Sequence, residues 1–265
     1  MRPEGTTERR RGAWRWLPPA LVLVGLLAAW QLAASTDVIA DALDLEPFLV
    51  PSPVEIAKSL WENRTLLAEN AWITLREIVL GLACALAAGL TVAVALHLSG
   101  TLRRAIYPLT VASQTIPIIV IAPIIAVWFG YGIGPKLLVV ALICFFPITV
   151  NTLDGLRSVD PDAIKLMRTL DASRWQIFRR VEAPEALPYA FSGARIAATI
   201  APIGAVFAEL SGATTGISGL GHLIFQDGVQ LQVARQFAAV AVLSAMAIGL
   251  FGLLALAERR VVTWR

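Results

Sequence analysis

The sequence predicts an all-α, polytopic membrane protein with about six transmembrane helices. Hydrophobic residues make up 57% of the chain and charged residues only 15%, whereas a soluble domain usually carries about 25% charged residues. The mean hydropathy is +0.70. The apolar residues also occur in runs long enough to cross a bilayer, separated by shorter polar segments.

The chain begins with a cytoplasmic N-terminal segment, residues 1–16, which is polar and rich in arginine. We expect no packed structure there. The apolar run at 17–34 predicts the first transmembrane helix. A basic start and small residues at its end also fit a signal peptide, but the run exceeds the usual apolar core of about 7–15 residues. We therefore expect a retained helix.

Residues 35–70 have the composition of an external loop, with seven acidic and two basic residues. The prolines at 51 and 53 interrupt the chain, and Val54–Asn70 then predicts an amphipathic helix that leads back to the membrane.

The remaining residues, 71–265, predict a membrane core with five further spans, at 72–96, 105–128, 136–150, 189–208 and 237–257. The span at 105–128 contains Pro108, Pro117 and Pro123, so we expect it to be kinked. Residues 209–235, rich in Gly, Ser and Thr, predict an external loop.

The distribution of basic residues predicts the orientation. Sixteen Lys and Arg residues lie in the N-terminal segment, the 99–104 turn, the 157–180 stretch and the tail, and only five lie on the opposite side. By the positive-inside rule both termini are cytoplasmic, and so is the polar segment at 158–188. The same clusters account for the pI of about 9.2 without any role in nucleic-acid binding.

The 158–188 segment predicts two short helices. Asp160 is a good N-cap with Pro161 at the first helical position, and Ser173 is a good N-cap for a second helix. We expect Pro184 and Pro188 to end that second helix. Each helix has one apolar face, formed by Ala163, Leu166, Met167 and Leu170 and by Trp175, Ile177, Phe178 and Val181. Such faces fit either a groove on a cytoplasmic partner or the lipid interface.

Several short motifs follow one another in a fixed order along residues 48–264. They are Leu49-Val50-Pro51-Ser52-Pro53, Ala122-Pro123 with Trp128-Phe129-Gly130, Phe146-Pro147-Ile148, the 158–188 segment, Ala208-Glu209 and Gly219-Leu220-Gly221. In this order and spacing the chain resembles the permease subunits of bacterial ABC importers, in the branch that handles nitrate, sulfonates, taurine and thiamine-precursor pyrimidines.

The resemblance implies that the 158–188 segment is the coupling loop that docks on a cytoplasmic ATPase. The residues that it assigns to this contact are Asp162, Lys165, Leu166, Met167, Leu170, Asp171, Ala172, Ser173, Trp175 and Phe178. The segment departs from the family pattern at two places, which comprise four residues. Lys165-Leu166-Met167 stands where the family has Glu-Ala-Ala, and Asp171 stands where it usually has Gly.

The chain lacks the sequence features of an ATPase or a metalloprotein. It contains no G-x-x-x-x-G-K-[ST] phosphate loop, so we expect ATP and Mg²⁺ to bind to a separate ATPase subunit. This chain is then not an enzyme and has no cofactor of its own. His97 and His222 are isolated and Cys84 and Cys144 lie within apolar runs, so we expect no metal site.

Polar residues within or next to the spans are candidates for the translocation pathway: Gln114, Thr115, Asn151, Thr199, Glu209 and Ser211. Each fits an interhelical hydrogen bond as well as a contact with solute. Arg195 lies near the cytoplasmic end of its span, where its side chain can reach the interface. Ionisable residues are otherwise scarce within the spans, which argues against an ion-coupled carrier.

The resemblance implies a permease subunit of an ATP-driven importer for a small organic solute. The C-terminal part resembles most the permeases for thiamine-precursor pyrimidines, and a sulfonate, taurine or nitrate importer is the alternative. The implied partners are a cytoplasmic ATPase dimer, an external solute-binding protein and a second copy of the chain, in the bacterial inner membrane. An ion-coupled secondary carrier and a membrane scaffold without transport activity also remain open.

Overall fold

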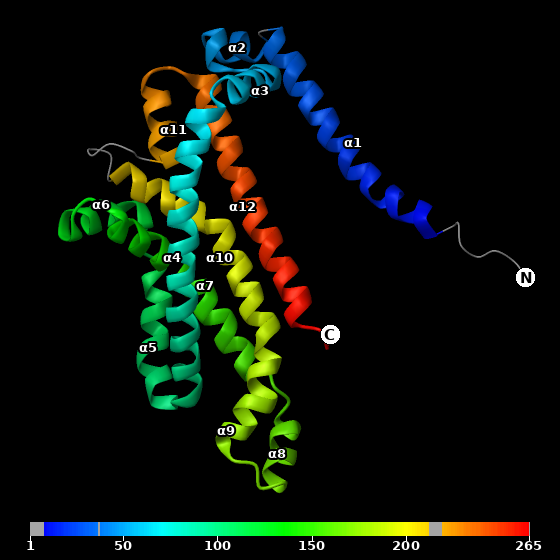
Figure 1. The fold of residues 1–265 in the computed structure, drawn as a ribbon, viewed down its shortest axis with the longest axis vertical. Helices are drawn as coiled ribbons and strands as arrows, with labels where there is room; N and C mark the ends of the chain where they lie inside the picture. Colours follow the sequence, from blue (N-terminus) through cyan, green and yellow to red (C-terminus); the bar gives the residue numbers. More distant parts are fainter. Residues whose placement is uncertain (1–7, 37, 212–218, 265) are drawn as a thin grey trace, which may run out of the picture. The chain divides into compact units, whose positions relative to one another are not determined.

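The computed structural model describes residues 8–36, 38–211 and 219–264. Those residues contain no strand, and long helices dominate them (Figure 1), in agreement with the predicted all-α class. The α-helices are α1 Glu8–Ser35, α2 Val38–Leu43, α3 Pro53–Glu62, α4 Arg64–Leu98, α5 Gly100–Ser113, α6 Ile118–Phe129, α7 Ile133–Arg157, α8 Pro161–Thr169, α9 Arg174–Ile177, α10 Ala183–Ser211, α11 Gly219–Val229 and α12 Val233–Val261.

Five described helices are long and apolar enough to cross a membrane: Leu17–Ser35 within α1, α4, α7, the continuous helix Arg174–Ser211 and α12. The span predicted at 105–128 is not one kinked helix but two helices, α5 and α6, and α6 has only 12 residues. The break falls before Pro117, because a proline disfavours helical geometry in the residue that precedes it.

The helix boundaries differ from the predicted ones at three other places. α1 begins at Glu8, within the segment that was expected to be unstructured, and residues 1–7 lie outside the described residues. The amphipathic helix expected at Val54–Asn70 ends at Glu62, and α4 starts at Arg64. The expected external loop at 209–235 contains the helix α11, and its residues 212–218 lie outside the described residues.

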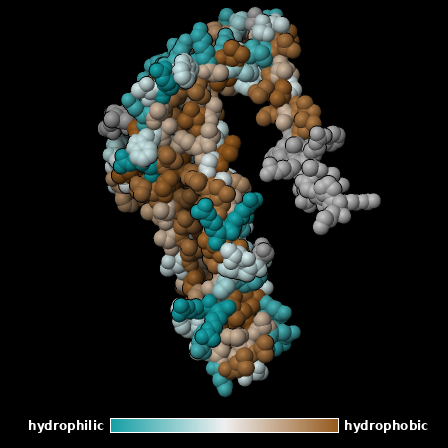
Figure 2. All heavy atoms as spheres, turned by 45° about the vertical axis from the view of Figure 1, so that its right-hand side comes forward, coloured by the Kyte–Doolittle hydropathy of each residue, from teal (hydrophilic) through white to brown (hydrophobic). Residues whose placement is uncertain are grey.

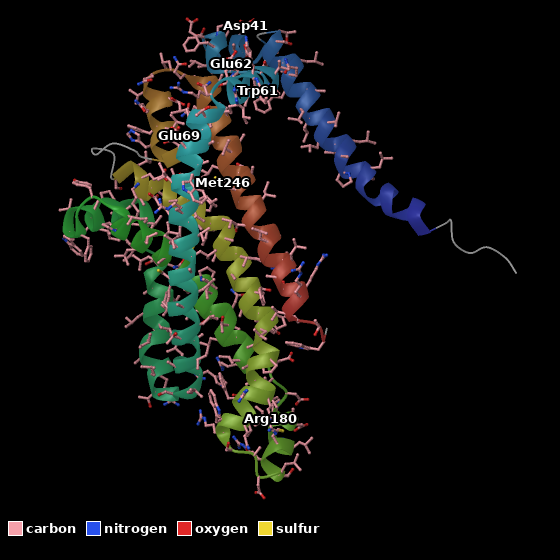
Figure 3. All side chains as sticks on the ribbon, viewed as in Figure 1. Asp41, Trp61, Glu62, Glu69, Arg180 and Met246 are labelled. Atoms are coloured by element: carbon pink, nitrogen blue, oxygen red, sulfur yellow. The ribbon has the colours of Figure 1, made fainter. Side chains whose placement is uncertain are left out.

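The described chain divides into two compact units. One comprises Met1–Arg64 and Gln226–Ala238. In it, α3 begins with a capping box, because the Ser52 hydroxyl accepts from the Glu55 N–H while the Glu55 carboxylate accepts from the Ser52 N–H. The Val54 N–H donates to the Gln31 side chain of α1. Trp61 and Glu62, at the end of α3, are labelled in Figure 3.

The other unit comprises Thr65–Phe225 and Ala239–Arg265, and its core lies between α4, α7 and α10. α7 and α10 run side by side (Figure 1), and small residues allow the helices to approach closely. A Cβ atom on Gly193 of α10 would lie 2.6 Å from the Pro147 carbonyl oxygen of α7, and one on Gly81 of α4 would lie 2.6 Å from Val140. The buried residues are Ile78, Leu82, Ala85, Val140, Cys144, Ile148, Ala197, Ala198, Ala201 and Ala205.

Apolar side chains also cover much of the outer surface of the helices. Figure 2 shows hydrophobic side chains over much of the visible face, with hydrophilic ones gathered at its ends and in a smaller cluster between them. Val127 and Trp128 of α6 and Ile248 of α12 are each more than 70% exposed. Exposed apolar surface of this extent fits a hydrocarbon solvent and partner subunits rather than water.

Candidate functional site

The 158–188 segment forms its first helix as predicted. The Asp160 carboxylate accepts a 2.8 Å hydrogen bond from the Asp162 N–H, and Pro161 is the first helical residue of α8. Lys165 and Asp162 form an exposed ion pair of 2.8 Å along the same helix. α8 has no fully buried residue, and only Ala163, Ile164 and Met167 are half-buried, so its caps contribute much of its stability.

Asp171 ends α8 in the left-handed backbone conformation, with φ 55°. Its N–H donates to the Arg168 carbonyl at 3.0 Å, and the Ala172 N–H donates to the Met167 carbonyl at 3.0 Å. This pair of bonds is a Schellman motif, in which the left-handed residue is usually Gly. Asp171 therefore performs the conformational role that a glycine usually has in this motif, at the steric cost of a side chain.

The second helix of the segment begins at Ser173, again as predicted. Ser173 and Gln176 form a capping box, in which each side chain accepts from the other residue's backbone N–H. This helix does not end at Pro184 or Pro188, contrary to the prediction. A π-helical turn at Phe178–Glu182 joins α9 to α10, where the Ala183 N–H donates to the Phe178 carbonyl. The wider turn leaves room ahead of the prolines, so one helix continues from Arg174 into the membrane.

Both helices of the segment present apolar side chains at the surface. Leu166 is 62% exposed, Leu170 69% and Trp175 63%. Trp175 stacks on Phe178 with 5.4 Å between ring centroids. Figure 3 places Arg180 at the same end of this unit as α8 and α9. The segment thus combines a capped, self-supporting backbone with an exposed apolar surface among basic residues.

The 158–188 segment contacts the last two residues of α4. The sequence did not predict these contacts. His97 lies 2.9 Å, Nε2 to Oε2, from Glu182, and the Arg174 guanidinium donates to the Leu98 carbonyl at 2.9 Å. His97 is therefore not the isolated boundary residue that we expected. A cavity of about 290 Å³ separates these contacts from α8 and is lined by His97, Ile164, Arg168, Ala172, Arg174, Ile177 and Glu182.

One of the candidate pathway residues borders a cavity. Gln114 lies at the break between α5 and α6, on a cavity of about 280 Å³ lined also by Ile116, Pro117, Ile118, Ile121, Leu142, Ile143 and Phe145. Thr115 is exposed nearby, and its hydroxyl donates to the Ala112 carbonyl at 2.8 Å. This cavity combines an apolar wall, one aromatic ring and one amide.

Three other candidates bond to their own helices. The Asn151 amide donates to the Pro147 carbonyl, the Thr199 hydroxyl to the Ile196 carbonyl, and the Ser211 hydroxyl to the Phe207 carbonyl. Their distances of 2.7–2.9 Å indicate satisfied local bonds. In this conformation the structure does not bring these three side chains together with Gln114.

Glu209 is fully buried and caps the start of α11. Its carboxylate accepts a 2.6 Å hydrogen bond from the Thr74 hydroxyl of α4 and a short one from the Gly221 N–H. The Thr74 hydroxyl in turn accepts from the Leu220 N–H at 2.8 Å. Gly219 and Gly221 lie directly against this carboxylate, which leaves no space for a Cβ atom. Glu209, on α10, thus joins α4 and α11, and its bond to Thr74 spans 135 residues of sequence.

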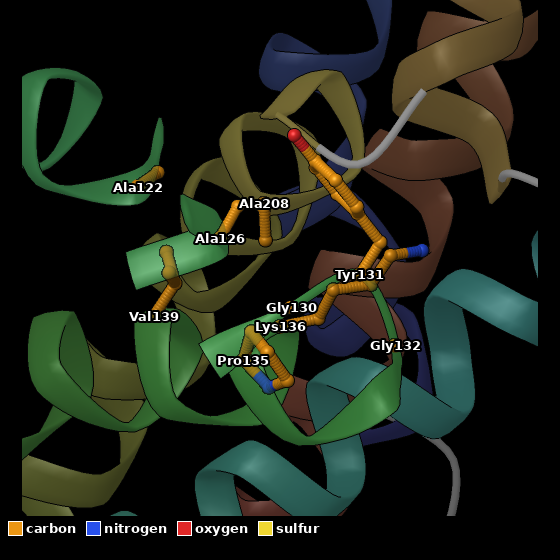
Figure 4. Close-up of a pocket in the computed structure, with 9 residues that line it drawn as sticks. All are labelled: Ala122, Ala126, Gly130, Tyr131, Gly132, Pro135, Lys136, Val139 and Ala208. Carbon is orange, nitrogen blue, oxygen red and sulfur yellow. The ribbon is translucent and has the colours of Figure 1, made fainter. Parts of the chain in front are cut away.

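A buried ion pair lies one turn further along α4. The Lys136 ammonium of α7 donates to Glu77 at 2.7 Å, and the side chains are 13% and 3% exposed. Lys136 also lines a small pocket with Tyr131 and Ala208 (Figure 4). Sequence reasoning missed Glu77 and Thr74 because both lie in an apolar run with no pattern that marks their partners.

Arg195 also has a partner inside the second unit. It lies 3.2 Å from the Glu258 carboxylate of α12 and over the Phe251 ring at 5.8 Å. The described spans therefore carry more paired ionisable residues than the sequence suggested. Each of these pairs links two helices, which is the usual arrangement for ionisable groups within a membrane domain.

Comparison with known proteins gives consistent matches along the chain. Residues 78–263 match the family model for a binding-protein-dependent transport system inner membrane component. The chain is 35% identical over 254 residues to the formylaminopyrimidine transport permease protein ThiX of Halalkalibacterium halodurans, covering 96% of this chain and 98% of that one. It is also 35% identical over 257 residues to the riboflavin transport system permease protein RibX of Chloroflexus aurantiacus, covering 96% and 92%.

Two further matches extend the comparison. The taurine transport system permease protein TauC of Escherichia coli is 31% identical over 270 residues, covering 96% of this chain and 94% of that one. Among solved structures, an inward-facing form of the MetNI methionine ABC transporter aligns with a TM-score of 0.60 at 22% identity, covering 76% of this chain and 97% of that one. The likeness to that structure concerns the fold.

Proposed function

The chain belongs to the family of binding-protein-dependent transport system inner membrane components and is a permease subunit of an ABC importer, and we propose that its solute is a thiamine-precursor pyrimidine. The 35% identity to a formylaminopyrimidine permease along 96% of the chain supports this choice, and the equally similar riboflavin permease also favours a nitrogen heterocycle. A sulfonate, taurine or nitrate is the second candidate, supported by the match to the taurine permease.

The cavity at the break between α5 and α6 favours the pyrimidine. Its described lining contains the Gln114 amide, the Phe145 ring and aliphatic side chains, and no Lys or Arg. An amide and an aromatic ring suit a neutral nitrogen heterocycle, which they can bond at its edge and stack on its face. A sulfonate or nitrate instead calls for a cation or several N–H donors.

The energy for transport comes from a separate cytoplasmic ATPase dimer, which binds ATP and Mg²⁺. The exposed Leu166, Leu170 and Trp175 form the apolar centre of the docking surface, with Lys165 and Asp171 at its edge. A capped helix with an apolar face is suited to a groove on a partner protein. The basic residues of the segment and of both termini support a cytoplasmic location for all three.

Transport then follows alternating access. Two copies of the chain enclose the pathway, and an external solute-binding protein delivers the solute. ATP binding closes the ATPase dimer, the 158–188 segments move, and the spans open outward to receive the solute. Hydrolysis of ATP resets the spans toward the cytoplasm. The residues of this chain thus bind the solute and transmit the movement of the ATPase to the spans, and the ATPase subunit hydrolyses ATP.

The solute is tested with the binding protein that works with this permease. Calorimetry is expected to give tight binding of a formylated aminopyrimidine and no heat with taurine, an alkyl sulfonate or nitrate. Uptake of the labelled pyrimidine by cells should then be lost on deletion of the permease and unaffected by excess taurine. Tight binding of taurine or nitrate, with no pyrimidine binding, would overturn the pyrimidine assignment in favour of the second candidate.

Docking is tested by two exposed-residue variants. Leu166→Glu places a carboxylate on the exposed face of α8, where it should weaken co-purification of the ATPase by at least about tenfold. Val54→Glu, at a 64% exposed position of α3, is the matched control and should leave co-purification unchanged. Equal recovery of the ATPase with both variants would contradict the proposed docking surface.

A further inference from the structure

Within the 158–188 segment, the Arg174–Glu182 part makes specific contacts with the rest of its unit, and α8 makes few. α8 has no buried residue, and its Ile164 and Arg168 line the cavity of about 290 Å³. The part from Arg174 to Glu182 instead makes three separate contacts, all with the last two residues of α4. A force applied to α8 therefore reaches α7 through the short link at 158–160, and it reaches α4 and α10 through the Arg174–Glu182 part.

The contacts with α4 are specific and mostly enclosed. The side chains of His97 and Glu182 are each only 13% exposed, and their polar atoms lie 2.9 Å apart. The Phe178 ring lies 6.5 Å from the His97 ring. Arg174 donates to the Leu98 carbonyl at the C-terminus of α4, which is the end of a helix that favours a cation.

Glu182 occupies a place where the helix is adaptable. It is the last residue of the π-helical turn that joins α9 to α10. Such turns depart from the regular ladder of helix hydrogen bonds and occur frequently at functional sites. The His97–Glu182 pair therefore holds α9, Arg174–Ile177, at a fixed angle to α4. α10 begins directly after Glu182.

α4 then extends to the opposite end of the unit. Its 35 residues correspond to about 50 Å of helix. Near its far end, Thr74 binds the Glu209 carboxylate and the Leu220 N–H at the start of α11. If α4 moves as a rigid helix, a displacement of His97 along its axis also moves Thr74, which changes the hydrogen bonds that hold α11.

We propose that His97 and Glu182, together with Arg174 on the Leu98 carbonyl, form a joint through which the 158–188 segment moves α4 together with α10. The two side chains are positioning residues, since they touch neither solute nor nucleotide. The inference rests on the proposed function, because it requires an ATPase that pushes on the segment. Without the joint, the cytoplasmic end of α4 receives that push only indirectly, through the shared core with α7 and α10 and through the Thr74–Glu209 bond.

The test measures ATP hydrolysis and solute uptake in the same proteoliposomes, with the permease, its ATPase and its binding protein. His97→Ala and Glu182→Ala are expected to keep assembly and ATP hydrolysis within about twofold, and to lower solute imported per ATP by at least about fivefold. The swapped variant His97→Glu with Glu182→His rebuilds the pair and should recover most of this ratio. Lys58→Ala, which removes an exposed ion pair of α3, is the control and should change nothing.

The outcomes separate the joint from the function on which it rests. An unchanged ratio in His97→Ala would overturn the joint, and so would an equal loss of hydrolysis and uptake, which marks a defect of folding or docking. A swapped variant as poor as the single variants would also contradict it. Absence of ATP-dependent uptake with the unmodified chain would overturn the proposed function itself, and the joint with it.

Discussion

Gly193 offers a direct test of how α7 and α10 pack. A Cβ atom on Gly193 would lie 2.6 Å from the Pro147 carbonyl oxygen, 3.0 Å from Asn151 Cβ and 3.1 Å from Ile148 Cα. Two of these three atoms belong to the α7 backbone, so no side-chain rotation can relieve the contact. Gly193→Ala must therefore push the two helices apart.

The size of the effect follows from two opposing contributions. Overpacking costs about 1–3 kcal/mol, and we take about 3 kcal/mol because backbone atoms are involved. Replacing Gly by Ala in a helix returns about 1 kcal/mol. The expected net loss is about 2 kcal/mol, or a drop in Tm of about 4–8 °C for a chain of this size. Gly249→Ala in α12 is the matched control, because no atom lies within 4 Å of its Cβ position, and it should raise Tm by about 2–4 °C.

Thermal unfolding of the purified chain in detergent can be followed with a thiol-reactive dye. Cys144 is buried, and Cys84 is exposed, so a Cys84→Ser background leaves Cys144 as the reporter of unfolding. A Tm for Gly193→Ala at or above that of the background, together with the expected rise for Gly249→Ala, would refute the close packing of α7 on α10.

Three further predictions concern single contacts. Asp171→Gly removes the steric cost of a side chain in the left-handed conformation and should stabilise the last turn of α8 by about 0.5–1 kcal/mol. Hydrogen-exchange mass spectrometry should then show amide exchange a few-fold slower in that turn, and faster exchange would contradict the assigned turn. Ser173→Ala should cost about 1 kcal/mol of local stability, read as faster exchange in α9, and unchanged exchange would argue against the capping box. Lys136→Met should lower the free energy of unfolding by about 3–5 kcal/mol because it leaves Glu77 unpaired. The double variant Lys136→Met with Glu77→Met should recover most of the lost Tm. A double variant as unstable as the single one would contradict the pairing.

Local features of the fold were predictable where a short stretch of sequence determines them. Asp160 and Ser173 cap the helices that follow them as predicted, because a cap depends only on residues within one turn. The apolar runs also predicted the long helices α1, α4, α7, α10 and α12, although their ends extend further than the apolar cores. Length and composition are enough for this, because a bilayer imposes both.

Several of the helix boundaries that were predicted wrongly lie at prolines, because the effect of a proline on a helix depends on its surroundings. Pro117 divides the predicted third span, whereas Pro184 and Pro188 do not end the helix that runs into α10. In a membrane domain, neighbouring helices and local π-helical turns can satisfy the backbone groups that a proline frees. A proline therefore indicates an irregularity, and the sequence alone does not indicate whether it is a break, a kink or a wider turn.

The functional contacts were beyond sequence reasoning for a different reason. His97 and Glu182 are 85 residues apart, and Thr74 and Glu209 are 135 residues apart. No local period or cap links such residues, so nothing in the sequence marks them as partners. Only the packing of α4 and α10 against α7 brings them together, and that packing depends on small residues such as Gly81 and Gly193, whose α7 partners are also distant in sequence.

The central claim is that this permease imports its solute with energy from an ATPase subunit. The most direct measurement is uptake of labelled pyrimidine into proteoliposomes that contain the permease and its ATPase, with binding protein outside and ATP inside. We predict uptake that requires both ATP and the binding protein and that persists when proton and sodium gradients are abolished. Uptake that continues without ATP and collapses with an ion gradient would contradict the account and indicate a secondary carrier.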